Sequence, residues 1–123
     1  NVFVSKGFLS ISPIQHYKVS FYIFICTSDL EGFGLVVIES MSYGVVPVVY
    51  GSYEAIYDII DNGKSGLITP IPYNSQKTID CISLLIENEK LRKEMAKEAM
   101  CKAKCFTIDS VITRWYNLFE EVL

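Results

Sequence analysis

Two uninterrupted apolar runs constrain the fold of this chain more than any other feature. The segments Phe21–Cys26 (FYIFIC) and Val45–Tyr50 (VVPVVY) lack the alternation of apolar and polar residues that marks a strand with one face in water. Even when the first run is extended back to Val19, it is far shorter than the roughly 20 apolar residues of a membrane-spanning helix. Such runs are typical of strands buried on both faces, which occur in parallel sheets covered by helices on both sides.

Segments with helical character separate these runs. The sequence predicts short helices over 11–19, 34–43 and 54–61, longer helices over 76–87, 89–105 and 109–122, and further short strands over 2–4 and 66–69. Gly44 is expected to end the second helix, and Asn62–Gly66 (NGKSG) to form a tight turn. The order of these elements predicts an α/β fold with a Rossmann-like parallel sheet, helices on both faces and right-handed crossovers.

Length and composition are consistent with one domain over residues 1–123. Half of the residues are hydrophobic and a fifth are charged, which suits a chain with a large core. The net charge of −3 argues against nucleic acid as a partner, since that class of protein needs a basic surface. The four cysteines form no CxxC pair and the only histidine, His16, is distant in sequence, so no metal site is predicted. Because the chain opens on a strand without an initiating Met, we expect it to be a fragment of a longer protein, and no signal peptide is visible.

The stretch TSDLEGFGLVVIES, residues 27–40, carries the candidate site. It follows the carboxyl end of a predicted buried strand, where ligands bind in sheets of this kind. Gly32 and Gly34 flank Phe33 where the strand gives way to a helix, and glycine permits positive φ and close approach of a ligand to the main chain. The first amides of a helix have no partner within it, and its dipole favours anions such as phosphate.

Two glutamates lie on either side of this turn. Glu39 follows Leu35 by four residues, so the two share a helical face, and helical side chains lean towards the N-terminus, which directs Glu39 towards the ligand. A carboxylate in that place can accept hydrogen bonds from two neighbouring hydroxyls, as on a ribose. Glu31, just before the turn, can contact the other end of the same molecule. The alternative is that Glu31 is a loop residue and Glu39 an exposed helix position, neither with a ligand.

The segment EGFGLVVIESMSYGVVPVV resembles the E-x7-E signature, with its continuation, of the retaining, two-domain (GT-B) group 1 glycosyltransferases. DIIDNGKSGLI is similar to the family segment that usually reads E-I-I-x-x-G-x-x-G-L-L, and RWYNLFEEVL resembles the closing helix. The resemblance implies that residues 1–123 are the C-terminal, nucleotide-sugar-binding half of a hexosyltransferase-type enzyme. It also implies that the isolated fragment is inactive, because the N-terminal domain is absent.

The resemblance further implies a role for each site residue. Glu31 would be the catalytic residue, contacting donor-sugar hydroxyls and stabilising charge without covalent attack. The substrate-binding set would be Gly32, Phe33, Gly34, Leu35 and Glu39, with main-chain amides of Phe33, Gly34 and Leu35 on the sugar and diphosphate and Glu39 on the ribose. Thr27 and Ser28 are further candidates, and no metal and no cofactor are implied. The chain departs from the family at Glu54-Ala55, where the family often has Gly-Gly, and at Asp58, where it has Glu.

The implied partners are a UDP-, GDP- or ADP-linked sugar donor and a glycan or lipid-linked acceptor that the missing N-terminal domain would hold. The implied place is the cytoplasm, with peripheral association of the full-length protein at the inner face of the membrane. Two alternatives stay open: a nucleotide-sugar epimerase of the GT-B fold, and a non-catalytic flavodoxin-like or receiver-type regulatory module. In the last helix, Trp115, Tyr116 and Phe119 are expected to pack in the core or between domains.

Overall fold

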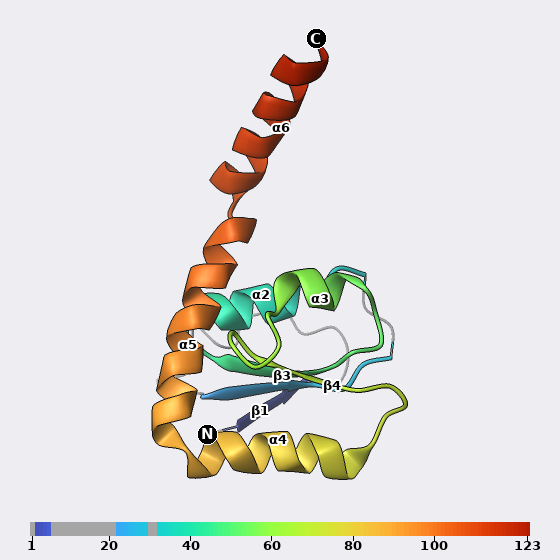
Figure 1. The fold of residues 1–123 in the computed structure, drawn as a ribbon, viewed down its shortest axis with the longest axis vertical. Coiled ribbons are helices and arrows are strands. Elements are labelled where there is room, and N and C mark those ends of the chain that lie inside the picture. Colours follow the sequence, from blue (N-terminus) through green and yellow to red (C-terminus); the bar gives the residue numbers. More distant parts are fainter. Residues whose placement is uncertain (1, 6–21, 30–31) are drawn as a thin grey trace.

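The chain folds around a four-stranded parallel sheet whose strand order follows the sequence (Figure 1). The structure, a computed structural model, describes residues 2–5, 22–29 and 32–123. The strands are β1 (Val2–Ser5), β2 (Ile23–Cys26), β3 (Val46–Tyr50) and β4 (Leu67–Thr69). In the register of the sheet, Ile23 pairs with Val2 on one side and with Val46 on the other. The expected helix over residues 11–19 lies outside the described residues.

The described helices agree with the sequence prediction to within two residues at each end. They are α2 (Leu35–Ser42), α3 (Ala55–Ile59), α4 (Ser75–Glu87), α5 (Glu89–Ala103) and α6 (Ile108–Val122), with a 3₁₀ turn, η1 (Lys104–Phe106), between the last two. Side chains of Asn74, Asn88 and Thr107 each accept a hydrogen bond from a main-chain N–H in the first turn of the next helix, which explains why α4, α5 and α6 begin where they do. Gly44, with a φ of 71°, ends α2 as expected.

Helices cover both faces of the sheet, which confirms the predicted fold class. On one face the buried cluster joins β2 and β3 to α2, α3 and the C-terminal half of α5: Phe24, Cys26, Val49, Val37, Ile38, Met41, Ile56, Ile59, Ala99 and Ala103. On the other face a second buried cluster joins the same strands to α4 and the N-terminal half of α5: Ile23, Ile25, Val46, Val48, Leu85 and Met95. Successive residues of β2 alternate between the two clusters, so a strand without polar residues still has two distinct faces. Burial of each large apolar side chain contributes about 1.5–3 kcal/mol.

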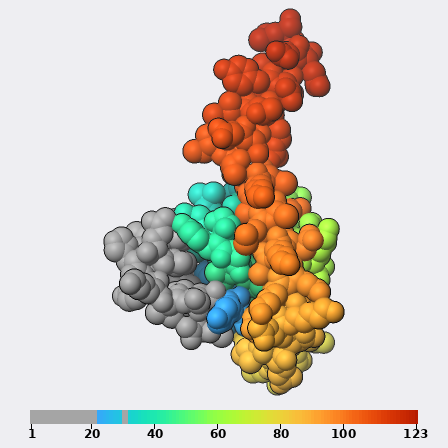
Figure 2. Space-filling view, turned by 90° about the vertical axis from the view of Figure 1, so that its left-hand side faces the viewer, coloured from blue at the N-terminus to red at the C-terminus, as the bar shows by residue number. Residues whose placement is uncertain are grey.

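Helix α6 extends beyond the body of the molecule in both views (Figures 1 and 2). None of its residues is buried, and Trp115, Tyr116 and Phe119 are each more than half exposed. Packing of these three residues in the core, one of the two predicted alternatives, is therefore wrong: the helix forms as predicted, but it extends beyond the sheet instead of packing on it. Packing of this face between domains stays a prediction. Among the described residues, no helix is both long and apolar enough to cross a membrane.

Candidate functional site

The candidate site lies at the carboxyl edge of the sheet, where β2, β3 and β4 end. Parallel strands end at a common edge, so the segment after β2 and the loop after β3 meet there. Thr27 and Ser28 leave β2 as partly buried residues, and α2 begins at the same edge after the glycine turn. The segment predicted to carry the site thus lies at the carboxyl edge of the sheet.

Gly34 is the N-cap of α2 and has a φ of 88°, in the left-handed region. A Cβ atom at this position would lie 2.6 Å from the hydroxyl oxygen of Tyr53 and 3.3 Å from Cδ1 of Ile59. Both the backbone conformation and the lack of space therefore call for glycine here. The Gly34 carbonyl accepts from Val37 N–H at 3.0 Å and from Ile38 N–H at 3.2 Å, so the hydrogen-bond ladder of α2 begins at this residue.

The main-chain amides at the start of α2 are the groups that can receive an anion. The first amides of a helix have no acceptor within the helix, and the helix dipole places partial positive charge at this end. Gly32 and Phe33 are exposed, and a Cβ at Gly32 would have no atom within 4 Å, so the outer side of the turn is open. The turn thus has an inner side closed by Tyr53 and an outer side that a ligand can approach.

The ring of Phe33 packs edge-on against Phe106 of η1, with 6.2 Å between ring centroids and 68° between planes. This contact joins the glycine turn to the segment that follows α5, about seventy residues later in the chain. The Phe33 side chain has its own packing partner, which is compatible with the predicted use of its main chain rather than its ring.

Leu35 and Glu39 are both exposed on α2, which agrees with the prediction that they share a face. Glu31 lies outside the described residues, so its position relative to Glu39 and the other predicted site residues stays a prediction. The structure brings together the strand end with Ser28, the turn with Gly34, and the first turn of α2.

Sequence reasoning missed the contribution of the loop after β3. The Ser52 hydroxyl donates to the Ser28 carbonyl oxygen at 2.9 Å, and the Tyr53 hydroxyl lies against Gly34. The only sequence signal for this loop was its departure from the family pattern around Glu54-Ala55. That departure gave no indication of which residues the loop contacts.

The family of the chain follows from comparison with known proteins. The family model for glycosyl transferases group 1 matches residues 5–100, which is most of the chain. The chain belongs to this family. Membership favours the transferase interpretation over the flavodoxin-like or receiver-type alternative.

Individual relatives and solved structures of this group agree with the assignment. A Campylobacter jejuni protein, N,N'-diacetylbacillosaminyl-diphospho-undecaprenol alpha-1,3-N-acetylgalactosaminyltransferase, is 32% identical over 101 residues, which cover 82% of this chain and 26% of that protein. The crystal structure of the C-terminal domain of LpcC, a glycosyl transferase group 1 family protein from Francisella tularensis, matches with a TM-score of 0.61 and 28% identity over 68% of this chain and 42% of that one. HepE from Anabaena, in complex with UDP and glucose, matches in fold with a TM-score of 0.70 and 23% identity over 80% of this chain and 27% of that one.

The chain spans between 10% and 30% of the length of the first curated relatives that it matches. These relatives are therefore much longer proteins than the present chain.

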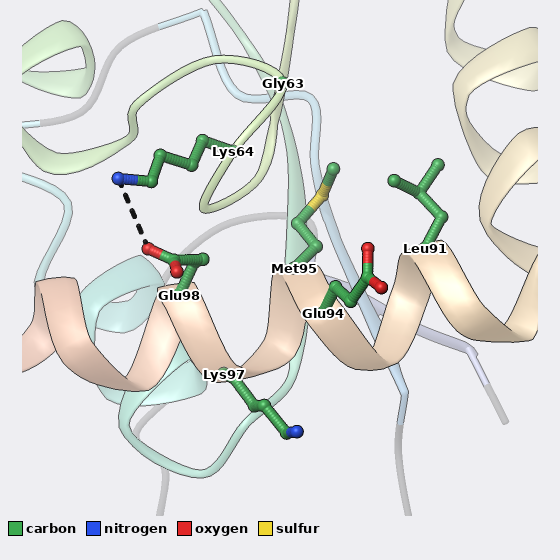
Figure 3. Close-up of a pocket in the computed structure, with 7 residues that line it drawn as sticks. All are labelled: Gly63, Lys64, Leu91, Glu94, Met95, Lys97 and Glu98. Atoms are coloured by element: carbon green, nitrogen blue, oxygen red, sulfur yellow. Dashed lines mark ion pairs between the residues drawn. The ribbon is translucent and has the colours of Figure 1, made fainter.

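A surface depression lies away from this edge (Figure 3). It has a volume of about 360 Å³ and lies between the turn before β4 and α5; Lys64 forms a 3.5 Å ion pair with Glu98 across it. Met95 points towards the turn, whereas Lys97 points away from the ion pair (Figure 3). Since the turn precedes β4, this depression is at the amino edge of the sheet and is separate from the glycine turn.

Among the residues that the structure describes, the titratable groups with shifted pKa values lie outside the site. Burial raises the pKa of the Cys81 thiol on α4, and the charge of Asp80 acts in the same direction. A hydrogen bond from Lys93 lowers the pKa of Glu89 on α5. Among the described residues, no group of three or more His, Cys, Asp or Glu side chains could hold a metal ion. The described residues at the glycine turn offer a ligand main-chain donors, hydroxyls and the carboxylate of Glu39.

Proposed function

We propose that this chain is the donor-binding domain of a group 1 glycosyltransferase that moves a hexosyl group from a nucleotide-diphosphate sugar to a glycan or lipid-linked acceptor, with retention of configuration. The observation that carries the proposal is the glycine turn: Gly34, with its left-handed φ, starts α2 at the carboxyl edge of a parallel sheet. HepE, a protein of the same fold, binds UDP and glucose in its crystal structure, which supports a nucleotide sugar as the ligand.

In the proposed complex, the diphosphate lies at the N-terminus of α2. The amides of Phe33, Gly34 and Leu35 donate to the phosphate and sugar oxygens, and the helix dipole stabilises the negative charge. Gly32 lets the ligand approach the exposed side of the turn, and Thr27 and Ser28 lie at the strand end beside it. Glu39 accepts hydrogen bonds from the ribose hydroxyls, and Glu31 contacts the donor sugar.

The proposed contribution to catalysis is charge stabilisation and positioning. When the bond between the sugar and the diphosphate breaks, negative charge develops on the departing nucleoside diphosphate and positive charge on the sugar ring. Fixed main-chain donors stabilise the first, because they require no reorganisation as the reaction proceeds. A carboxylate at position 31 would stabilise the second and orient the sugar, and neither role requires a metal ion.

The chemical nature of the acceptor bears on which further domain the proposed enzyme has and on where it acts. The C. jejuni relative carries a diphospho-undecaprenol acceptor in its name, which supports a lipid-linked acceptor for this chain. We propose that a separate N-terminal domain binds the acceptor, and that the enzyme acts in the cytoplasm at the inner face of the membrane.

Titration with UDP-, GDP- and ADP-glucose, followed by NMR of the main-chain amides, tests the donor assignment. We expect shifts of the amides of residues 32–36 with at least one of these donors. Glu39→Ala should raise the dissociation constant about tenfold or more, because a hydrogen bond to a charged group contributes about 1.5–3 kcal/mol. Glu87→Ala is the matched control, since Glu87 is an exposed glutamate of α4, which covers the opposite face of the sheet.

The outcomes of this titration separate two conclusions. If none of the three donors shifts the amides of the glycine turn, the donor-binding proposal fails for this chain. If a donor binds and Glu39→Ala binds it as tightly as Glu87→Ala does, the ribose assignment of Glu39 is wrong while donor binding stands.

A further inference from the structure

The loop after β3 contacts the candidate site at two places, Ser28 after the end of β2 and Gly34 at the start of α2. On one side, the Ser52 hydroxyl donates a hydrogen bond of 2.9 Å to the carbonyl oxygen of Ser28, two residues after the end of β2. This bond joins residues that are 24 positions apart in the chain and partly buried. The direction of the main chain as it leaves β2 therefore depends on a side chain from the neighbouring strand's loop.

On the other side, Tyr53 supports the start of α2. Its hydroxyl is buried and occupies the space where a side chain at Gly34 would lie, 2.6 Å from the position of a Cβ there. The ring packs against the buried cluster beneath α2 and α3, and the Tyr53 carbonyl accepts from Ile56 N–H at 3.4 Å where α3 begins. The ring is thus held by the core, and its hydroxyl limits how far the turn at Gly34 can move inwards.

A glycine turn needs such support more than other turns do. Glycine has the widest choice of backbone conformations, so a turn built from Gly32 and Gly34 does not fix its own geometry. Main-chain donors act on a ligand only when they are held near the productive geometry, and displacements of about 1 Å weaken such sites strongly. The residues next to the turn must therefore restrict its backbone conformation, because the glycines of the turn do not.

We propose that Ser52 and Tyr53 are positioning residues of the donor site: Ser52 holds the strand end at Ser28, and Tyr53 holds the first turn of α2 at Gly34. This inference rests on the proposed function, since it concerns the same main-chain donors. Neither residue needs to touch the donor. Their effect on binding is exerted through Ser28 and Gly34.

Three substitutions that each remove one hydroxyl provide the test. Ser52→Ala removes the bond to Ser28, and Tyr53→Phe removes the group beside Gly34. Tyr57→Phe is the matched control, because the Tyr57 hydroxyl donates to the Gly51 carbonyl at 3.2 Å in the same loop. Ser52→Thr keeps the hydroxyl and serves as the rescue variant. Circular dichroism confirms that each variant has the helix content of the parent chain.

The first measurement is amide hydrogen exchange at Val37 and Ile38, whose N–H groups donate to the Gly34 carbonyl. We expect exchange about 3- to 10-fold faster in Ser52→Ala, the range that follows from the loss of one hydrogen bond. We expect faster exchange also in Tyr53→Phe, because this variant loses the hydroxyl that packs beside Gly34. The rates in Tyr57→Phe and Ser52→Thr should stay within about twofold of the parent, below that range. The second measurement is the dissociation constant for UDP from the same spectra, which should rise in the same two variants and in no other.

Each result decides a separate point. Unchanged exchange in both Ser52→Ala and Tyr53→Phe would overturn the positioning role. Faster exchange with an unchanged UDP affinity would overturn it as well, because order in the turn would then not matter to the donor. If Tyr57→Phe changes the exchange rates and the UDP affinity equally, Ser52 and Tyr53 only support the loop in general, and their specific positioning role is overturned. A parent chain that gives no shift with UDP or any donor nucleotide would instead reject the proposed function itself.

Discussion

Alanine at position 34 would destabilise the fold for two separate reasons. The φ of 88° places the residue in the left-handed region, where a side chain raises the energy by about 1–2 kcal/mol. In addition, the new Cβ would lie 2.6 Å from the Tyr53 hydroxyl, closer than Cβ atoms come to other heavy atoms, so the ring or the turn must shift. Overpacking of this kind adds about 1–3 kcal/mol. We therefore expect Gly34→Ala to lower the free energy of unfolding by about 2–5 kcal/mol.

The same substitution at Gly63 isolates the backbone effect. Gly63 has a φ of 83°, nearly the same as Gly34, but a Cβ there would have no atom within 4 Å. Gly63→Ala should therefore cost only about 1–2 kcal/mol. The difference between the two alanine variants then measures the crowding at position 34, which comes from the Tyr53 hydroxyl at 2.6 Å and from Cδ1 of Ile59 at 3.3 Å.

A third variant removes the contact and leaves the backbone effect. In Tyr53→Phe the nearest ring atom to the Cβ of residue 34 is Cζ, at 3.5 Å, which is an ordinary van der Waals distance. In that background the effect of Gly34→Ala should fall towards that of Gly63→Ala, with Cδ1 of Ile59 at 3.3 Å as the remaining close contact, which gives a coupling of about 1–3 kcal/mol in a double-mutant cycle. Urea unfolding followed by far-UV circular dichroism gives these values when the m values agree. Equal effects at the two glycines, or an effect at Gly34 that Tyr53→Phe leaves unchanged, would refute the contact as the cause.

Three further substitutions or reactions test the core, the last helix and the thiols. Leu85→Ala should lower the free energy of unfolding by about 2–5 kcal/mol, because Leu85 is fully buried under the sheet. Leu84 is exposed, so Leu84→Ala should change the free energy of unfolding by less than about 1 kcal/mol. Similar losses for both variants would contradict the described packing of α4. Trp115→Ser should change the free energy of unfolding of this chain by no more than about 0.5 kcal/mol, because the Trp115 side chain is 54% exposed. A larger loss in chemical unfolding would show that α6 packs on the body. Iodoacetamide should modify exposed Cys101 well before buried Cys26, as read by mass spectrometry of timed samples, and the reverse order would contradict the placement of β2 in the core.

The sequence was sufficient for the elements and their order because both depend on local patterns. Ile23–Cys26 and Val46–Tyr50 are strands as the apolar runs predicted, and Gly44 ends α2 where expected. The same local reasoning placed Gly34 at the start of a helix and put Leu35 and Glu39 on one exposed face. For these features, periodicity and the conformational freedom of glycine carry enough information.

Contacts between distant segments could not be predicted in this way. The hydrogen bond from Ser52 to Ser28, the position of Tyr53 beside Gly34 and the packing of Phe33 on Phe106 each depend on how two loops meet in space. The spacing of residues along the sequence does not indicate which loops come into contact. The exposure of Trp115 has a related cause: an apolar helical face predicts that something covers it, but periodicity does not say whether the sheet does.

The contact between Phe33 and Phe106 has a consequence for the C-terminal segment. Phe106 is the last residue of η1, and Thr107 caps α6 immediately after it, so the outlying helix begins two residues after a ring that touches the glycine turn. Upstream, α5 contributes residues to both buried clusters, and Phe106 packs against the cluster that includes Ala99 and Ala103. The segment between α5 and α6 is thus held against the body of the molecule by the same ring that lies beside Phe33.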